Sequence, residues 1–145
     1  MIGLYDAVKA KLDADCPSLV QVVTGQQSIE VVEMLALGAE VTALVHPISD
    51  VADRIRSATM IVSQGVVERF GVTMCLVFPG GFPQWEQARE EIKAALRGWA
   101  PAGASMPCEY AGGRTLAYEL GEDGGRWLHL LEFTVPTQET YGHQS

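Results

Sequence analysis

The sequence predicts a single small α+β domain. Residues 2–14 and 83–97 carry apolar side chains at the three- and four-residue spacing of amphipathic helices. Between them, residues 67–78 alternate with the period of two that marks a β-strand with one face on the core. A length of 145 residues and a hydrophobic fraction of 48% suit one domain that buries its own core.

The first forty-five residues are expected to form a helix, a strand, a second helix and a second strand. Pro17 ends the first helix, and residues 19–23 form a short apolar strand. Residues 28–37 again show helical spacing, with Gly38 placed to cap the helix end, and residues 41–45 form the next strand. The apolar stripe of the first helix consists of Ile2, Tyr5, Val8 and Leu12.

The middle of the chain is expected to hold a loop and then one long strand. His46-Pro47 closes the preceding strand, because proline has no N–H to give to a sheet. Residues 49–59 mix charged and small residues without a period, which predicts a loop with at most one helical turn. The strand over 67–78 is longer than usual, so its start near Arg69 is expected to protrude beyond the sheet.

The helix over 83–97 has clear end signals. Pro83 suits the first turn, and Gly98 suits the position just after the last turn. Trp99 follows the end of this helix and is therefore expected to pack against the sheet. The expected packing residues of this part of the chain are Trp85, Trp99, Trp127 and Phe133.

The last third predicts paired strands. Short strands over 108–110 and 115–120 lie on either side of Gly112-Gly113, and residues 122–125 form a hairpin turn. Residues 126–135 form the final strand, which Pro136 ends. The domain is therefore assigned to residues 1–136, with 137–145 as a polar tail that is either mobile or ordered only by a partner.

No pattern in the sequence predicts catalysis, a metal or a cofactor. The histidines His46, His129 and His143 lack metal-ligand spacing, and His129 is expected to be a buried histidine with satisfied hydrogen bonds. Three cysteines, odd in number and far apart, form neither a disulfide framework nor a metal motif. Unpaired cysteines of this kind fit a reduced intracellular environment. The N-terminus does not have the pattern of a signal peptide, and no run of 18 apolar residues predicts a membrane span.

The charge distribution is acidic at both ends. The net charge is −8: residues 1–50 carry −5, residues 51–100 carry +1 and residues 101–145 carry −4. Such a chain does not bind nucleic acid by neutralising phosphates, although acidic segments can line a passage that DNA crosses without binding. The basic residues Arg54, Arg56 and Arg69 predict an arm that contacts another chain, and open sheet edges offer a second means of pairing with a subunit.

Several motifs appear together in one order. Val45-His46-Pro47-Ile48-Ser49-Asp50 follows the N-terminal helix, and the strand Glu68-Arg69-Phe70-Gly71-Val72-Thr73-Met74 comes next. A helix then closes in Leu96-Arg97-Gly98-Trp99-Ala100-Pro101, ahead of Tyr110-Ala111-Gly112-Gly113-Arg114 and a final strand with Trp127 and Phe133. Over residues 2–135 the chain resembles the tail terminator family of tailed bacteriophages and prophages. Residues 25–38 depart from the family by being more helical and more apolar than a connector needs.

The resemblance implies a mostly antiparallel sheet flanked by helices and a structural role without enzymatic activity. Tail terminators form a hexameric ring on the last ring of tail tube protein, end tube growth and provide the surface for head joining. The implied partners are other copies of the chain, the tail tube protein and a head-completion or neck protein, with DNA passing through the lumen unbound. The implied location is the neck end of the virion tail, after assembly in the bacterial cytoplasm.

Two alternatives stay open at this point. One is another ring protein of the neck or tail-completion complex. The other, from a different class, is a small ligand-binding domain or enzyme with a pocket near Trp99, Trp127 and His129.

Overall fold

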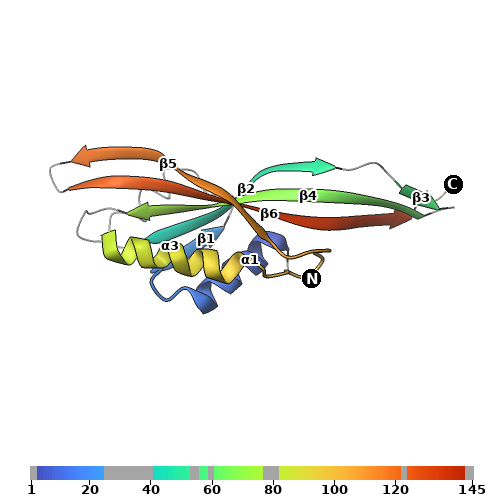
Figure 1. The fold of residues 1–145 in the computed structure, drawn as a ribbon, viewed down its shortest axis with the longest axis horizontal. Helices are drawn as coiled ribbons and strands as arrows, with labels where there is room; N and C mark the ends of the chain where they lie inside the picture. Colours follow the sequence, from blue (N-terminus) through green and yellow to red (C-terminus); the bar gives the residue numbers. More distant parts are fainter. Residues whose placement is uncertain are drawn as a thin grey trace.

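The computed structural model describes residues 3–24, 41–52, 56–58, 61–76, 82–121 and 124–142. These residues form two helices and one mixed sheet, with both helices on the same face of the sheet (Figure 1). The predicted α+β class is confirmed. The elements are α1 (Leu4–Asp15), β1 (Gln21–Thr24), β2 (Thr42–Ala52), β3 (Arg56–Ala58), β4 (Ile61–Leu76), α3 (Phe82–Leu96), β5 (Glu109–Gly121) and β6 (Gly124–Gly142).

The sheet is mostly antiparallel, as expected. Its order is β1-β2-β4-β6-β5, and β3 pairs with β4 beyond the end of β2. Only β1 and β2 run parallel among the described strands. The two central strands are the longest, with 16 residues in β4 and 19 in β6, and they stay paired from Ile61 opposite Gly142 to Leu76 opposite Trp127.

The long strands divide the sheet into two parts. One part lies over the helices; the other continues past them and is free of described helices (Figure 1). The second part is called the arm. It consists of β3 with residues 49–52 of β2, 61–69 of β4 and 134–142 of β6. The expectation that the long strand starts at residue 67 and protrudes beyond the sheet near Arg69 was wrong: β4 starts at Ile61, and Arg69 is paired with Ser49 of β2 and with Thr134 of β6, so the strand extends past the helices but stays within the sheet.

The main core lies between the helices and the sheet. The predicted alternation of β4 is confirmed, because Phe70, Val72, Met74 and Leu76 all belong to this core. The Phe70 ring stacks on the Phe133 ring of β6 at 5.6 Å between centroids. The helices contribute Val8, Leu12, Trp85, Ala88, Ile92, Ala95 and Leu96, and Trp99 packs against them. Leu44, Cys75 and Leu128 form a smaller buried cluster on the opposite face of the sheet.

Helix α3 ends where the sequence places its end. Gly98 adopts a left-handed φ of 84°, a conformation that costs a glycine little and other residues more. The Gly98 amide donates to the Cys108 carbonyl, and the Cys108 amide donates to the Trp99 carbonyl. The loop between α3 and β5 is therefore closed at its base by two backbone hydrogen bonds.

Pro47 does not end β2, so two predictions about this region were wrong. The strand continues to Ala52, and β3 occupies 56–58, where a loop over 49–59 was expected. Two features let β2 accept proline. Among the described residues, β1 pairs with β2 only as far as Val45, so no described strand pairs with Pro47 on the side away from β4, and the register shifts between Pro47 and Ser49. The long β4 supplies a pairing partner that the local sequence does not reveal.

Pro136 does not end β6, which continues to Gly142 through most of the expected tail. The Pro136 carbonyl accepts a hydrogen bond from the Ser105 amide in the loop before β5. In a strand the N–H and C=O of one residue point to the same side. The missing donor of Pro136 therefore lies on the loop side, and its absence removes no hydrogen bond to β4.

The Gly112-Gly113 pair does not separate two strands. β5 is one strand from Glu109 to Gly121, with register shifts at Tyr110/Gly112 and Thr115/Ala117. Gly112 has a φ of 128°, so the glycine pair accommodates a bulge and not a turn. The predicted hairpin between β5 and β6 is confirmed by the pairing of Gly121 with Gly124. The expected helix over 28–37 lies outside the described residues.

Candidate assembly surfaces

The His, Cys, Asp and Glu side chains of the described residues do not gather into a metal-binding group. No cluster of three or more His, Cys, Asp or Glu among them could hold a metal ion, and none of their helices is long and apolar enough to cross a membrane. The three cysteines are buried and unbridged. Burial raises the pKa of Cys16 to about 12, with Glu91 and Asp15 adding to it, and burial raises that of Cys108 to about 11. Both thiols are therefore protonated and unreactive at neutral pH.

His129 is part of the packing between α3 and the sheet. The Trp85 ring stacks on the Trp127 ring at 4.8 Å and meets the His129 ring edge-on at 5.2 Å. The Thr115 hydroxyl accepts a hydrogen bond from Trp127 Nε1 and lies 3.2 Å from His129 Nδ1. Burial lowers the pKa of His129, and the nearby Arg89 cation lowers it further. The expected burial of His129 is confirmed, but its hydrogen bonds are not all satisfied, because the buried Nε2 has no hydrogen-bond partner among the described residues.

The structure does not bring Trp99 together with Trp127 and His129, the residues near which a ligand pocket was expected. Trp127 lies against Trp85, in the first turn of α3, whereas Trp99 follows the last turn. The helix separates the two sites by about 20 Å, at 1.5 Å per residue. Lys11 Nζ lies 6.0 Å from the Trp99 ring, which places Trp99 beside α1.

The glycine motif of β5 shapes the surface above the end of α3. The Tyr110 ring packs against Phe133 at 5.4 Å, and Lys93 Nζ lies 4.7 Å from its centroid. A Cβ atom on Gly113 would come within 2.7 Å of the Tyr110 hydroxyl and 3.1 Å of the Leu130 carbonyl. Glycine at this position therefore lets the tyrosine ring lie flat along its own strand.

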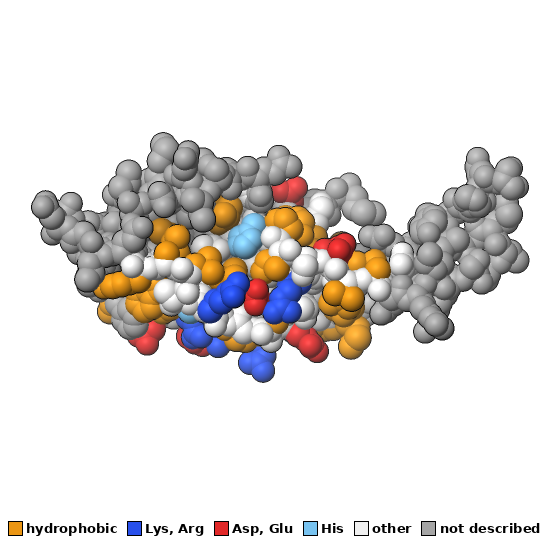
Figure 2. All heavy atoms as spheres, turned by 90° about the horizontal axis from the view of Figure 1, so that it is seen from above, with side chains coloured by type: hydrophobic (Ala, Val, Ile, Leu, Met, Phe, Trp, Pro, Cys, Tyr) orange, Lys and Arg blue, Asp and Glu red, His pale blue; other side chains and the backbone are white. Residues whose placement is uncertain are grey.

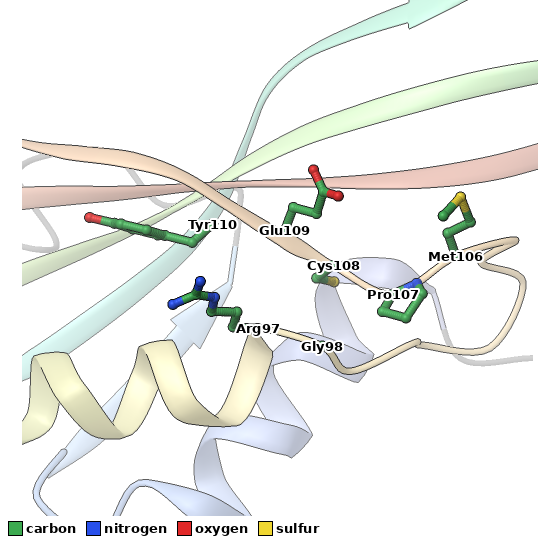
Figure 3. A pocket seen from close by; sticks show the side chains of 7 residues that line it. All are labelled: Arg97, Gly98, Met106, Pro107, Cys108, Glu109 and Tyr110. Carbon is green, nitrogen blue, oxygen red and sulfur yellow. The ribbon is translucent and has the colours of Figure 1, made fainter.

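An open hollow of about 430 Å³ adjoins this tyrosine (Figure 3). It lies between the C-terminal end of α3 and the start of β5. The Arg97 side chain points toward it, and Met106, which is 59% exposed, stands at its far end. Its lining consists of Arg97, Gly98, Met106, Pro107, Cys108, Glu109 and Tyr110. The sequence interpretation did not include this hollow, because its residues become neighbours only when the backbone hydrogen bonds of Cys108 with Gly98 and Trp99 close the loop between α3 and β5.

The structure tests the placement of the three predicted arginines only in part. Arg54 lies outside the described residues, and Arg56 pairs through its backbone with Ser63. Arg69 lies on β4 and forms a salt bridge of 2.9 Å to Glu132 of β6. Arg56 and Arg69 thus share the arm, but their positions are about 20 Å apart along β4, at 3.3 Å per residue.

The face of the sheet opposite the helices carries charged side chains at its centre (Figure 2). Strand alternation and register place Arg69, Glu132 and Arg114 on this face. His46 lies on the same face, with Nε2 2.8 Å from the Thr73 hydroxyl. A Cβ on Gly71 would meet Leu130 at 2.6 Å and His46 at 2.9 Å, so glycine is needed beneath these side chains.

The β2 border of the sheet is acidic. Asp50 of β2 stands directly opposite Glu68 of β4, and the two carboxylates lie near the Tyr5 hydroxyl of α1. Burial raises the pKa of Tyr5, and Glu68 and Asp50 raise it further. Two exposed apolar residues, Ile48 at 38% and Val51 at 65%, accompany Asp50. The sequence shows these residues, but only the strand register places the two carboxylates together.

No protein-family model and no curated protein sequence matches the chain. Among solved structures, the fold is similar to that of a chain in a structure described as "Virion of native gene transfer agent (GTA) particle". The TM-score is 0.51 and the sequence identity is 17%. The likeness covers 94% of this chain and 95% of that chain, so the two share a fold over nearly their whole lengths.

Proposed function

We propose that this protein is a structural component of a phage-like virion, and specifically a tail terminator. The observation that carries the proposal is the fold it shares, over 94% of its length, with a chain of a gene transfer agent virion. The order of motifs from Val45 to Phe133 that resembles tail terminators supports the finer assignment. In this role the chain forms a hexameric ring that caps the tail tube, ends its polymerisation and provides a surface for head joining.

The arm supports a role in assembly. In the arm, β2, β4 and β6 extend past the helices (Figure 1), and most of its described side chains are partly or fully exposed. In the proposed ring the arm, with Arg54, Arg56 and Arg69, contacts a neighbouring copy or the tail tube. The acidic N-terminal and C-terminal segments contribute to the lumen, where like charge keeps DNA from binding.

Electron microscopy of the purified protein, alone and mixed with tail tubes, tests the proposal. The expected result is a six-membered ring at one end of each tube and tubes of uncontrolled length when the protein is omitted. A ring that binds a head-completion protein but no tube end would instead identify another neck component. A monomer that binds neither, with tubes of normal length in its absence, would contradict the proposal.

A further inference from the structure

The outer flank of α3 faces the β5 side of the molecule. Within the helix layer, α1 packs against β1 and β2, whereas α3 packs against β4 and β5. Spacings of three and four residues place four charged side chains in one stripe along α3, here called the α3 stripe: Glu86, Glu90, Lys93 and Arg97. Lys93 lies over the Tyr110 ring of β5 and Arg97 lines the hollow beside it, so the stripe faces away from α1. Glu91, on the other flank of the helix, instead accepts hydrogen bonds from Ser18 in the turn after α1.

The α3 stripe is acidic in its first half and basic in its second. Glu86 and Arg97 are exposed, and among the described residues neither forms an ion pair. Glu90 contacts Arg89 at 3.1 Å, so Glu86 and Arg97 are the charges most available to a partner. The charges are mirrored about one point on the helix axis, since Glu86 corresponds in position to Arg97 and Glu90 to Lys93. A second copy of the helix in antiparallel orientation therefore brings an acidic residue level with a basic one at all four positions.

The two ends of this flank are complementary in shape as well. Tyr118 of β5 is 56% exposed, and its ring meets the Trp127 ring edge-on at 6.0 Å. Trp127 stacks on Trp85, so Tyr118 lies about level with the first turn of α3. The hollow lies at the other end of the helix, beside Gly98, with the exposed Met106 in its wall (Figure 3). The antiparallel arrangement that pairs the charges therefore also brings the exposed ring of one copy level with the hollow of the other.

We infer that two copies of the chain pair about a two-fold axis through this flank, with their α3 helices antiparallel. Glu86 of each copy faces Arg97 of the other, and Tyr118 of each copy fills the hollow beside Met106 of the other. Such a contact is isologous and ends at two copies. The inference goes beyond the proposed function and does not rest on it. Six copies around one six-fold axis share head-to-tail contacts, so this two-fold contact would join two such rings.

A second copy fits this flank better than an acidic protein or a nucleic acid. Either of those partners would meet the basic half of the α3 stripe but would be repelled by Glu86 and Glu90 in the other half. A copy of the same chain satisfies both halves at once, because the two-fold axis repeats each contact. The register shifts at Tyr110/Gly112 and Thr115/Ala117 interrupt the outer edge of β5, so side chains and not strand pairing form the contact.

Single charge reversals test the contact. Glu86→Lys and Arg97→Glu each place like charges opposite each other twice in a pair, so each should raise the dissociation constant for self-pairing by at least about tenfold. An equimolar mixture of the two variants should pair like the wild type, because both opposed positions of a mixed pair again carry opposite charges. Tyr118→Ser should weaken pairing by a similar factor, because the hollow loses its occupant. Sedimentation velocity over a range of concentrations measures pairing as a doubling of mass, either of the single chain or of the ring.

Asp6→Lys is the matched control for Glu86→Lys, since it reverses an exposed acidic residue in the first turn of the other helix, α1. It should pair like the wild type, and circular dichroism checks that every variant is folded. Wild-type protein that does not pair at its highest soluble concentration would overturn the inference. Pairing that persists in either single reversal, an equal loss in Asp6→Lys, or a mixture of folded variants that does not recover pairing would overturn it as well. Rings that cap tail tubes but never pair would overturn only the two-fold contact, whereas paired chains that cap no tube would overturn only the proposed function.

Discussion

The part of the sheet over the helices and the arm are built from the same strands but differ in what surrounds them. In β4, residues 70–76 are all buried, whereas most described side chains of 64–69 are partly exposed. In β6, 128–131 are buried and 134–137 are partly exposed except for Val135. The burial of side chains therefore differs between the two parts, whereas the backbone pairing of β4 with β6 continues without a break through both. The comparison shows that the helices supply the core, and that the arm is held by backbone pairing and left available for contacts.

Removing a large ring from the core gives the largest expected effect. Phe133 is fully buried against Phe70 and Tyr110, so Phe133→Ala should lower the free energy of unfolding by about 3–5 kcal/mol. Val67 on the arm is only partly buried, and Val67→Ala should cost less than about 1 kcal/mol. Urea unfolding of both variants measures the difference. Equal losses of unfolding free energy in the two variants would show that the arm contributes to the core as much as the part of the sheet over the helices does.

The boundary between the two parts gives the next largest effect. Gly71→Ala forces a Cβ against Leu130 and His46 and should cost about 1–3 kcal/mol, because Leu130 is buried and cannot move freely. Gly3→Ala is the matched control, since a Cβ there meets nothing within 4 Å. Thermal unfolding compares the two. An unchanged melting temperature for Gly71→Ala would mean that the side chains of Leu130 and His46 can move to make room for the added Cβ.

The arm salt bridge should affect assembly more than stability. Arg69 is 39% exposed but its partner Glu132 is only 17% exposed, so the bridge is partly buried and Arg69→Ala should lower the free energy of unfolding by about 1 kcal/mol. If the arm contacts the tube, the same variant should cap tubes less efficiently, which a count of capped tube ends measures. Normal capping by a folded Arg69→Ala protein would remove Arg69 from the proposed interface.

The smallest expected effect is a pH dependence of the free energy of unfolding, caused by His129 in the part of the sheet over the helices. Folding lowers the pKa of His129 below its ordinary value near 6.5, so between the two pKa values the unfolded chain binds more protons than the folded chain. The contribution of His129 to stability should therefore be complete above pH 6.5 and decline as the pH falls through the folded pKa. Unfolding of the wild type and of His129→Asn at pH 5 and 8 isolates this contribution. A larger stability loss at low pH in the variant than in the wild type would contradict the assignment.

Local sequence patterns predicted the elements that depend on local physics. The alternation of Phe70, Val72, Met74 and Leu76 and the glycine stop at Gly98 both correspond to what the structure shows. The strands through Pro47 and Pro136 were not predictable in this way, because their stability comes from pairing with β4. A proline ends a strand only when its missing N–H would have donated a hydrogen bond to a neighbouring strand. The sequence does not show which side of the strand carries that neighbour.

The candidate surfaces were less predictable than the fold. The sequence shows no catalytic motif, which favoured a role in assembly. Arg54, Arg56 and Arg69 were predicted as contact residues only because they are positively charged. The opposed carboxylates of Asp50 and Glu68 depend on strand register, and the hollow beside Tyr110 depends on how the loop between α3 and β5 closes. Register is set by contacts between residues that are distant in the sequence, so these surfaces appear only in the folded chain.

Hydrogen–deuterium exchange of the free protein and of the same protein bound to tail tubes tests whether the arm forms the assembly contact. Amides of the arm, residues 49–52, 61–69 and 134–142, are expected to gain protection on assembly. Amides of β4 and β6 above the helices, residues 70–76 and 127–133, should keep the protection that they already have. Equal protection of the arm in both states would show that the arm makes no assembly contact.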